Sequence, residues 1–136
     1  MPISHLLDTS VYCQPLKPQP LPTVEQRWRA LGDSAFATSA ICEAELLYGL
    51  ELKKSVRLQA LYDELLKSRV PILPVDTAVA KAFSIIKATC RKKGVSASDF
   101  DFLIAATAKA HGLILATLNV RHFQAIEGLA FENWSS

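Results

Sequence analysis

Three acidic residues from distant parts of the chain stand beside apolar segments, where an unpaired charge is costly. Asp8 lies in HLLDTSVY, Glu45 in SAICEAELLYGL and Asp101 in SASDFDFLIAATAKAHG. Burying carboxylates together costs several kcal/mol per ion unless something compensates the charge. A divalent cation such as Mg²⁺ or Mn²⁺ compensates it, because such ions prefer oxygen ligands and keep several waters. The pattern predicts a metal site suited to phosphate chemistry, in which the ion activates water and neutralises phosphoryl charge.

Asp8 and Asp101 each also have a simpler explanation at the start of a helix. The Asp-Thr-Ser that begins at Asp8 is a favourable capping sequence. Asp99 and Asp101 each follow a serine by three residues, the spacing of a capping box, and both would meet the positive end of the helix dipole. Capping is the preferred interpretation for Asp99. Asp101 shares a helical face with Ala105 and Ala108, which favours a carboxylate at the rim of a closely packed helix.

Glu45 has a neighbouring glutamate as its rival. It shares a helical face with Ile41, Tyr48 and Leu52, so that an acid interrupts an apolar stripe. Glu43 lies about 200° around the same helix and can point elsewhere. A glutamate at the edge of the stripe could also reach water. The helical pattern alone therefore leaves open which of the two glutamates faces inward.

Alternating strands and helices are expected to position these residues. Strands are predicted at 2–7, 34–39, 70–75, 113–117 and 129–134, with 70–75 in the interior of the sheet. Helices are predicted at 23–30, 40–53, 55–68, 77–93 and 96–112, with Thr23, Ser39 and Asp76 as N-terminal caps and Gly94 and Gly112 as stops. The proline-rich segment 14–22 is expected to be a stiff loop.

This alternation predicts an α/β fold with three layers, in which helices cover both faces of a central parallel sheet of four to five strands. The 136 residues suit one domain, residues 1–136. Functional groups in such sheets gather beyond the carboxyl ends of the strands. Asp8 ends the first strand and Asn119 follows the fourth, so the two residues should lie at the same edge.

Composition limits the class of protein without naming a partner. Half of the residues are apolar, which allows a sizeable core, and 15 basic against 13 acidic residues give a net charge of only +2. That charge is too small to indicate nucleic-acid binding, although local patches matter more than the sum. Three widely spaced cysteines are expected to be reduced core thiols in a cytoplasmic protein: Cys13, Cys42 and Cys90. Neither a signal peptide nor a membrane span is expected.

Basic residues gather in a few places that could meet a polyanion. The clusters are Lys53, Lys54 and Arg57, then Arg91, Lys92 and Lys93, with Arg121 alone. Charges at helix ends are commonly solvated, which is the simpler interpretation of both clusters. Arg121 is the best candidate for a phosphate contact if it lies near Asn119. Such a contact gives affinity without sequence information.

The words LLDTSVY, TSAICEAELLYGL and DFLIAATAKAHGLILATLNVRHF resemble the successive signatures of PIN-domain ribonucleases. The chain is most similar to the toxins of bacterial and archaeal VapBC toxin–antitoxin pairs. The resemblance runs from Leu6 to Phe123. Each word is only moderately specific, and the order, spacing and total length make the resemblance strong.

The resemblance implies that Asp8, Glu45 and Asp101 are the metal-binding and catalytic residues. It favours Glu45 over Glu43 and Asp101 over Asp99. Asp8 and Asp101 would hold the main ion, and Glu45 would bind through water or position the nucleophile.

The segment TLNVRHF matches the last signature of the family in part. Thr117 and Asn119 match it and are expected to support the site. His122 stands where the family often has a fourth acid, which puts a second metal ion in question. A phosphate-contacting or surface role is the favoured interpretation of His122, with metal binding as the alternative.

The resemblance further implies an endoribonuclease that depends on Mg²⁺ or Mn²⁺ and leaves a 3′-hydroxyl and a 5′-phosphate. A cognate antitoxin would push a basic side chain into the acidic site. Apolar side chains of the helices at 40–53 and 55–68 could form a homodimer or an antitoxin groove. The alternatives are a PIN-fold nuclease of RNA maturation and a catalytically impaired protein that binds RNA or a partner. The RNA substrate stays open.

Overall fold

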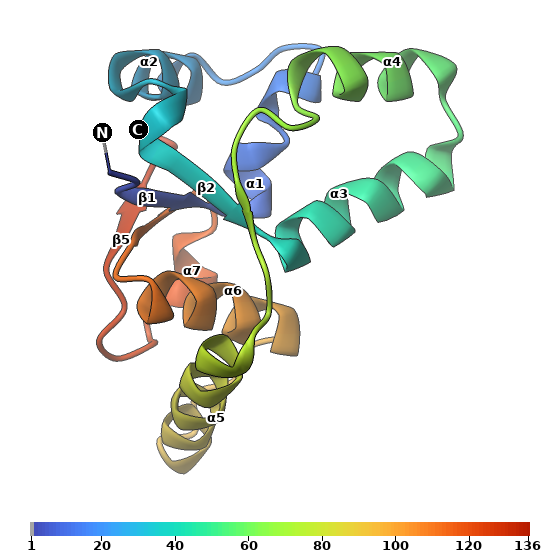
Figure 1. Ribbon diagram of the computed structural model, residues 1–136. Helices are drawn as coiled ribbons and strands as arrows, with labels where there is room; N and C mark the ends of the chain where they lie inside the picture. The colour runs from blue at the N-terminus through green and yellow to red at the C-terminus, as the bar shows by residue number, and fades with distance from the viewer. Residues whose placement is uncertain (1) are drawn as a thin grey trace.

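The computed structural model describes residues 2–136 and contains one five-stranded sheet in the order β3-β2-β1-β4-β5 (Figure 1). All four pairings between neighbouring strands are parallel, as predicted. The strands are β1 (His5–Leu7), β2 (Phe36–Ser39), β3 (Ile72–Leu73), β4 (Ile114–Thr117) and β5 (Phe131–Asn133). Each lies inside its predicted range and is shorter than it.

Helices cover both faces of this sheet (Figure 1). They are α1 (Thr9–Tyr12), α2 (Pro22–Leu31), α3 (Ala40–Lys53), α4 (Val56–Leu65), α5 (Thr77–Lys92), α6 (Asp99–Ala110) and α7 (Val120–Phe123), with short 3-10 turns at Gln14–Leu16 and Asp33–Ala35. The predicted three-layer α/β/α architecture is therefore confirmed. No helix within residues 2–136 is both long enough and apolar enough to cross a membrane.

Successive residues of the central strand β1 pack into two different cores, one on each face of the sheet. Leu6 packs into the core that includes Ile104 of α6 and Ile86 of α5. Leu7 points to the opposite face, where it packs into the core that includes Trp28 of α2 and Tyr62 of α4. Successive side chains of a strand face opposite sides, so β1 must be apolar at consecutive positions to be buried on both faces.

Most of the predicted helix ends are confirmed. The Ser39 side chain accepts a hydrogen bond from the amide of Cys42, and the Asp76 side chain accepts one from the amide of Val79. Gly112 follows α6 with a φ of 64°, a conformation that glycine adopts at little cost. The cap predicted at Thr23 is wrong. Helix α2 begins at Pro22, with Leu21 at the cap position, because proline suits the first helical position.

The prediction that residues 70–75 form an interior strand is also wrong. Only Ile72 and Leu73 form a strand, and β3 lies at the edge of the sheet next to β2. Pro71 and Pro74 flank these two residues. Proline donates no hydrogen bond to a neighbouring strand, which confines such a segment to an edge.

Candidate metal-binding site at the carboxyl edge of the sheet

Asp8 follows β1 directly and lies almost completely buried, with 4% of the residue exposed. Its Oδ1 accepts a hydrogen bond from the amide of Thr9 at 2.8 Å, which caps α1. Its Oδ2 accepts hydrogen bonds from the hydroxyls of Ser10 and Thr117, both at 2.8 Å. The capping interpretation of Asp8 is therefore correct, and the carboxylate is at the same time held from a second strand.

Burial raises the pKa of Asp8 above its ordinary value, even though three hydrogen bonds favour the charged form. The negative charge of Asp101 adds to this rise. A carboxylate has about four acceptor positions, and the three donors leave one of them open on Oδ1. Asp8 is thus a fixed, desolvated carboxylate with an unused lone pair and a second acid nearby.

The residues that follow β4 complete the support of Asp8. Thr117 accepts a hydrogen bond from the amide of Asn119 at 2.9 Å while its own hydroxyl proton goes to Asp8. Ser10 accepts one from the amide of Leu118 at 3.0 Å. The neighbouring parallel strands β1 and β4 bring these segments together. The prediction that Asp8 and Asn119 lie at the same edge of the sheet is confirmed.

Helix α3 directs its two glutamates to different partners. Oε1 of Glu45 accepts a hydrogen bond of 2.6 Å from the hydroxyl of Thr9, the residue after Asp8. Glu43 instead accepts hydrogen bonds from the hydroxyls of Tyr12 at 3.0 Å and Tyr62 at 2.8 Å. Burial, together with the hydrogen bond to Glu43 and its charge, raises the pKa of Tyr62 to about 12 and also raises the pKa of Tyr12. Glu45 is the glutamate that contacts the Asp8 segment.

The stripe of α3 that contains Glu45 does not face the core. Tyr48 and Leu52 are 67% and 69% exposed, whereas Cys42 and Leu46 are buried. These positions favour the alternative that Glu45 lies at the edge of its apolar stripe, where it can reach water. Glu45 is partly buried at the start of a face that runs out into solvent.

Asp101 lies in the first turn of α6, where the amide of Asp101 donates a hydrogen bond of 3.1 Å to the Ser98 cap. Its side chain is 20% exposed, and its Oδ2 lies 3.3 Å from Nδ1 of His122 in α7. Asp99 is 61% exposed and pairs with Lys87 at 2.7 Å. The preference for Asp101 over Asp99 at the rim of the sheet agrees with these positions.

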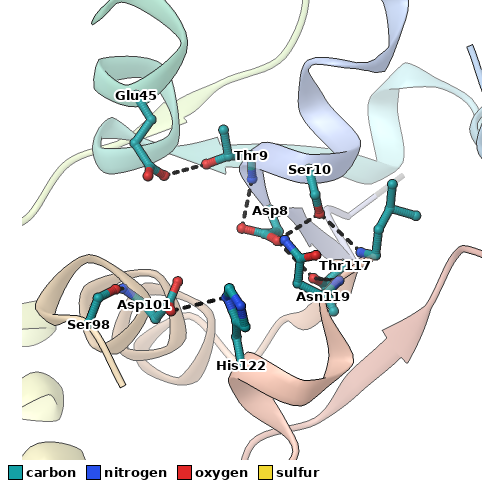
Figure 2. A network of polar contacts seen from close by, with 10 residues as sticks. Asp8, Thr9, Ser10, Glu45, Ser98, Asp101, Thr117, Asn119 and His122 are labelled. Carbon is teal, nitrogen blue, oxygen red and sulfur yellow. Dashed lines mark hydrogen bonds and ion pairs between the residues drawn. The ribbon is translucent and has the colours of Figure 1, made fainter. Parts of the chain in front are cut away.

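Figure 2 shows the carboxylates of Asp8, Glu45 and Asp101 reaching the same region from β1, α3 and α6. Within residues 2–136, no three His, Cys, Asp or Glu side chains stand close enough to form a ready cage around a metal ion. Magnesium is commonly held by one or two carboxylates, with water and substrate phosphate as the other ligands. The donor set of hard oxygens around a desolvated Asp8 fits an ion of that kind.

The profile of the PIN domain matches residues 5–129, almost the whole chain. The chain belongs to the PIN-domain family. Among curated relatives, the tRNA(fMet)-specific endonuclease VapC of Shigella flexneri is 31% identical over 133 residues, which cover 98% of this chain and 99% of that protein. Toxin FitB of Neisseria gonorrhoeae is 36% identical, with 95% of this chain and 97% of that protein covered.

Solved structures of PIN-domain relatives share the fold over nearly all of both chains. DNA-bound VapBC from Salmonella typhimurium matches with a TM-score of 0.85 and 32% identity, covering 97% of this chain and 98% of that chain. FitAcB from Neisseria gonorrhoeae matches with a TM-score of 0.86 and 32% identity, covering 96% of this chain and 97% of that chain. These matches extend the family assignment to the three-dimensional structure.

Sequence reasoning missed several members of this PIN-domain site. The sequence suggested only a capping role for Thr9 and Ser10. In the structure the Thr9 hydroxyl donates a hydrogen bond to Glu45, and the Ser10 hydroxyl donates one to Asp8. The tyrosine partners of Glu43 were also missed, since Tyr12 and Tyr62 lie 31 and 19 residues from it. The small polar pair directly after Asp8 was the available signal for Thr9 and Ser10.

Proposed function

We propose that this PIN-domain protein is a metal-dependent endoribonuclease and the toxin of a type II toxin–antitoxin pair. The observation that carries the proposal is the state of Asp8: a buried carboxylate, fixed by three hydrogen bonds, with its pKa raised by burial and by Asp101. Burying the charge of Asp8 without a positive partner costs free energy of folding, and a divalent cation would compensate that charge. The names of two relatives, a tRNA(fMet)-specific endonuclease at 31% identity and a toxin at 36% identity, support the same activity.

Asp8 and Asp101 would hold Mg²⁺ or Mn²⁺, and Glu45 would position the attacking water. When bound, the ion supplies an activated water and neutralises charge on the phosphoryl group. The hydroxyls of Ser10 and Thr117 keep Asp8 in one orientation. In-line attack on an RNA phosphodiester would leave a 3′-hydroxyl and a 5′-phosphate.

The remaining residues of the site have supporting roles in this proposal. The Thr9 hydroxyl fixes Glu45 through its hydrogen bond, which limits the orientations of that carboxylate. The backbone N–H of Asn119 donates a hydrogen bond to the Thr117 hydroxyl and so helps to orient the hydroxyl that bonds Asp8. Arg121, exposed in α7 two residues after Asn119, would contact an RNA phosphate.

An antitoxin is the proposed protein partner, because the VapBC and FitAcB structures matched by this chain are toxin–antitoxin complexes. We also propose a homodimer. Tyr48, Leu52 and Val56 expose apolar surface on α3 and at the start of α4, and burying it would favour association. An RNA-cleaving toxin would meet its substrate in the cytoplasm, where we place this protein.

The test of the proposed activity is cleavage of total RNA by the purified protein with Mg²⁺, Mn²⁺ or EDTA, with the cut sites mapped by sequencing. Cleavage is expected with either metal ion and not with EDTA. Asp101→Asn should abolish it, because this change removes the charge and keeps the shape. The matched control Asp99→Asn, on the exposed side of the same helical turn, should cleave normally. Equal cleavage by both variants would reject the assigned site.

Expression in cells separates a toxin from a nuclease of RNA maturation. Expression of the wild-type chain without an antitoxin should arrest growth, and Asp101→Asn should relieve the arrest. Normal growth with active wild-type protein would favour the maturation enzyme. Equal growth arrest by both forms would show that toxicity does not come from this site.

A further inference from the structure

His122 is the imidazole that contacts a candidate metal ligand within the described residues 2–136. Its Nδ1 lies 3.3 Å from Oδ2 of Asp101, and Figure 2 shows the ring reaching from α7 toward the acid on α6. Of the two other histidines, His5 is buried and bonds Glu132, and His111 is exposed at the opposite end of α6 from Asp101.

The helix that carries His122 fixes the position of its backbone beside Asp101. The amide of His122 donates a hydrogen bond of 2.9 Å to the carbonyl of Asn119. Phe123, the next residue, is completely buried and anchors α7 in the core of α5 and α6. The side chain of His122 itself is 55% exposed, so an ion in solution can reach it.

The separation of the two side chains suits two ligands of one ion. Bonds of about 2.1 Å at right angles place neighbouring ligand atoms about 3 Å apart. The observed 3.3 Å between Nδ1 and Oδ2 is close to this value. The contact also fits a simple ion pair. A metal ligand differs from an ion pair in one testable respect, because imidazole nitrogen binds transition metals in preference to Mg²⁺.

We propose that His122 is a nitrogen ligand of the divalent ion held by Asp8 and Asp101. This inference rests on the proposed function, and it gives this chain a mixed nitrogen and oxygen site. Mg²⁺ favours oxygen, whereas imidazole favours transition metals. His122 therefore raises the affinity of the site for Mn²⁺ and Co²⁺ relative to its affinity for Mg²⁺.

The decisive experiment is pulsed electron paramagnetic resonance of Mn²⁺ added to the full-length protein, which detects a directly coordinated ¹⁴N nucleus. The wild-type protein should show the ¹⁴N modulation of a bound imidazole. His122→Gln should lose it, and the matched control His111→Gln should keep it. Absence of the modulation in the wild type, or its persistence in His122→Gln, would overturn the inference.

Calorimetric titration supplies a second readout that does not depend on cleavage. His122→Gln should lower Mn²⁺ affinity about tenfold or more and Mg²⁺ affinity clearly less. An equal loss of affinity for Mn²⁺ and Mg²⁺ would indicate only a loss of electrostatic support. It would overturn the inference that His122 is a nitrogen ligand. Unchanged Mn²⁺ affinity with weaker RNA binding in EDTA would make His122 a phosphate contact instead.

Asp8→Asn separates failure of this inference from failure of the proposed site. If Asp8→Asn abolishes Mn²⁺ binding while His122→Gln leaves the ¹⁴N signal unchanged, the acidic site stands and the role of His122 is wrong. If Asp8→Asn binds Mn²⁺ like the wild type, the proposed site itself is wrong. The inference is supported when Asp8→Asn loses the ion and His122→Gln loses only the nitrogen ligand.

Discussion

The hydroxyl of Thr117 donates a 2.8 Å hydrogen bond to Oδ2 of Asp8, although 109 positions separate the two residues. Both side chains are buried where the parallel strands β1 and β4 end. This bond orients the Asp8 carboxylate from the end of the neighbouring strand β4, while the Ser10 hydroxyl orients it from helix α1. Asp8 therefore has a defined position before any ion binds.

Thr117→Val should impair both the site and the fold. Valine has nearly the same shape but removes the hydroxyl that serves Asp8 and the amide of Asn119. Leaving buried polar groups unpaired should cost about 1–3 kcal/mol in the free energy of unfolding, measured by urea denaturation. RNA cleavage should fall about tenfold or more, because Asp8 loses a fixed orientation. Thr117→Ser keeps the hydroxyl and should stay near wild type; failure of both variants alike would make packing the cause.

Thr9→Val should reduce cleavage without much change in stability. Its hydroxyl gives Glu45 a hydrogen bond of 2.6 Å at a partly buried position. Without that bond the Glu45 carboxylate loses its orientation, so kcat should fall more than KM changes. Thr9→Ser should restore the rate. A Thr9→Val protein with unchanged kcat would show that Glu45 needs no such support.

Glu43→Ala and Glu45→Ala should have opposite consequences. Glu43→Ala leaves the hydroxyls of Tyr12 and Tyr62 without their acceptor, so the free energy of unfolding should fall by about 1–3 kcal/mol. Glu45→Ala should be less destabilising and should abolish most RNA cleavage. Paired urea denaturation and cleavage assays measure both effects. Loss of cleavage in a folded Glu43→Ala protein, with Glu45→Ala active, would reverse the assignment.

The sequence predicted the architecture well because periodicity and capping are local signals. All five strands and the caps at Ser39 and Asp76 followed from residues a few positions apart. The topology of a parallel sheet then placed Asp8 and Asn119 at one edge. The error at 70–75 arose because apolar character was weighted above the two prolines that confine β3 to an edge.

The details of the site could not be predicted in the same way, because they depend on side chains that meet only after folding. Thr9 with Glu45 and Thr117 with Asp8 are 36 and 109 positions apart. The helical wheel left open which glutamate of α3 faces inward, and in the structure the stripe that contains Glu45 turns to solvent at Tyr48. The relative position of α3 and α1 decides that exposure, and no local pattern encodes it.

In the metal-free protein, Asp8→Asn should gain stability relative to the wild type as the pH rises from acidic to neutral. The folded state holds the proton of Asp8 more tightly than the unfolded state, because burial raises its pKa. Stability therefore falls as the pH rises from the ordinary carboxyl pKa through the raised one, and the loss persists at neutral pH. Asparagine removes this cost, although its amide nitrogen cannot accept the hydrogen bonds that Asp8 Oδ2 accepts from Ser10 and Thr117. The change of the stability difference with pH is therefore the informative quantity.

Thermal unfolding in EDTA measures this effect as the difference in Tm between Asp8→Asn and the wild type. The difference should shift in favour of Asp8→Asn as the pH rises from acidic to neutral, by about 3 °C per kcal/mol of relieved cost. Mg²⁺ should raise the Tm of the wild type only. A difference in Tm that stays constant between acidic and neutral pH would contradict the burial cost of the Asp8 charge.

The most direct test of the metal site is a crystal structure of the protein grown with Mn²⁺, with the ion located by its anomalous scattering. We predict a peak within bonding distance of Asp8 Oδ1, the oxygen with a free acceptor position, and of the Asp101 carboxylate. The same protein preparation should cleave RNA with Mn²⁺. An active preparation whose crystals show no ion between Asp8 and Asp101 would contradict the account.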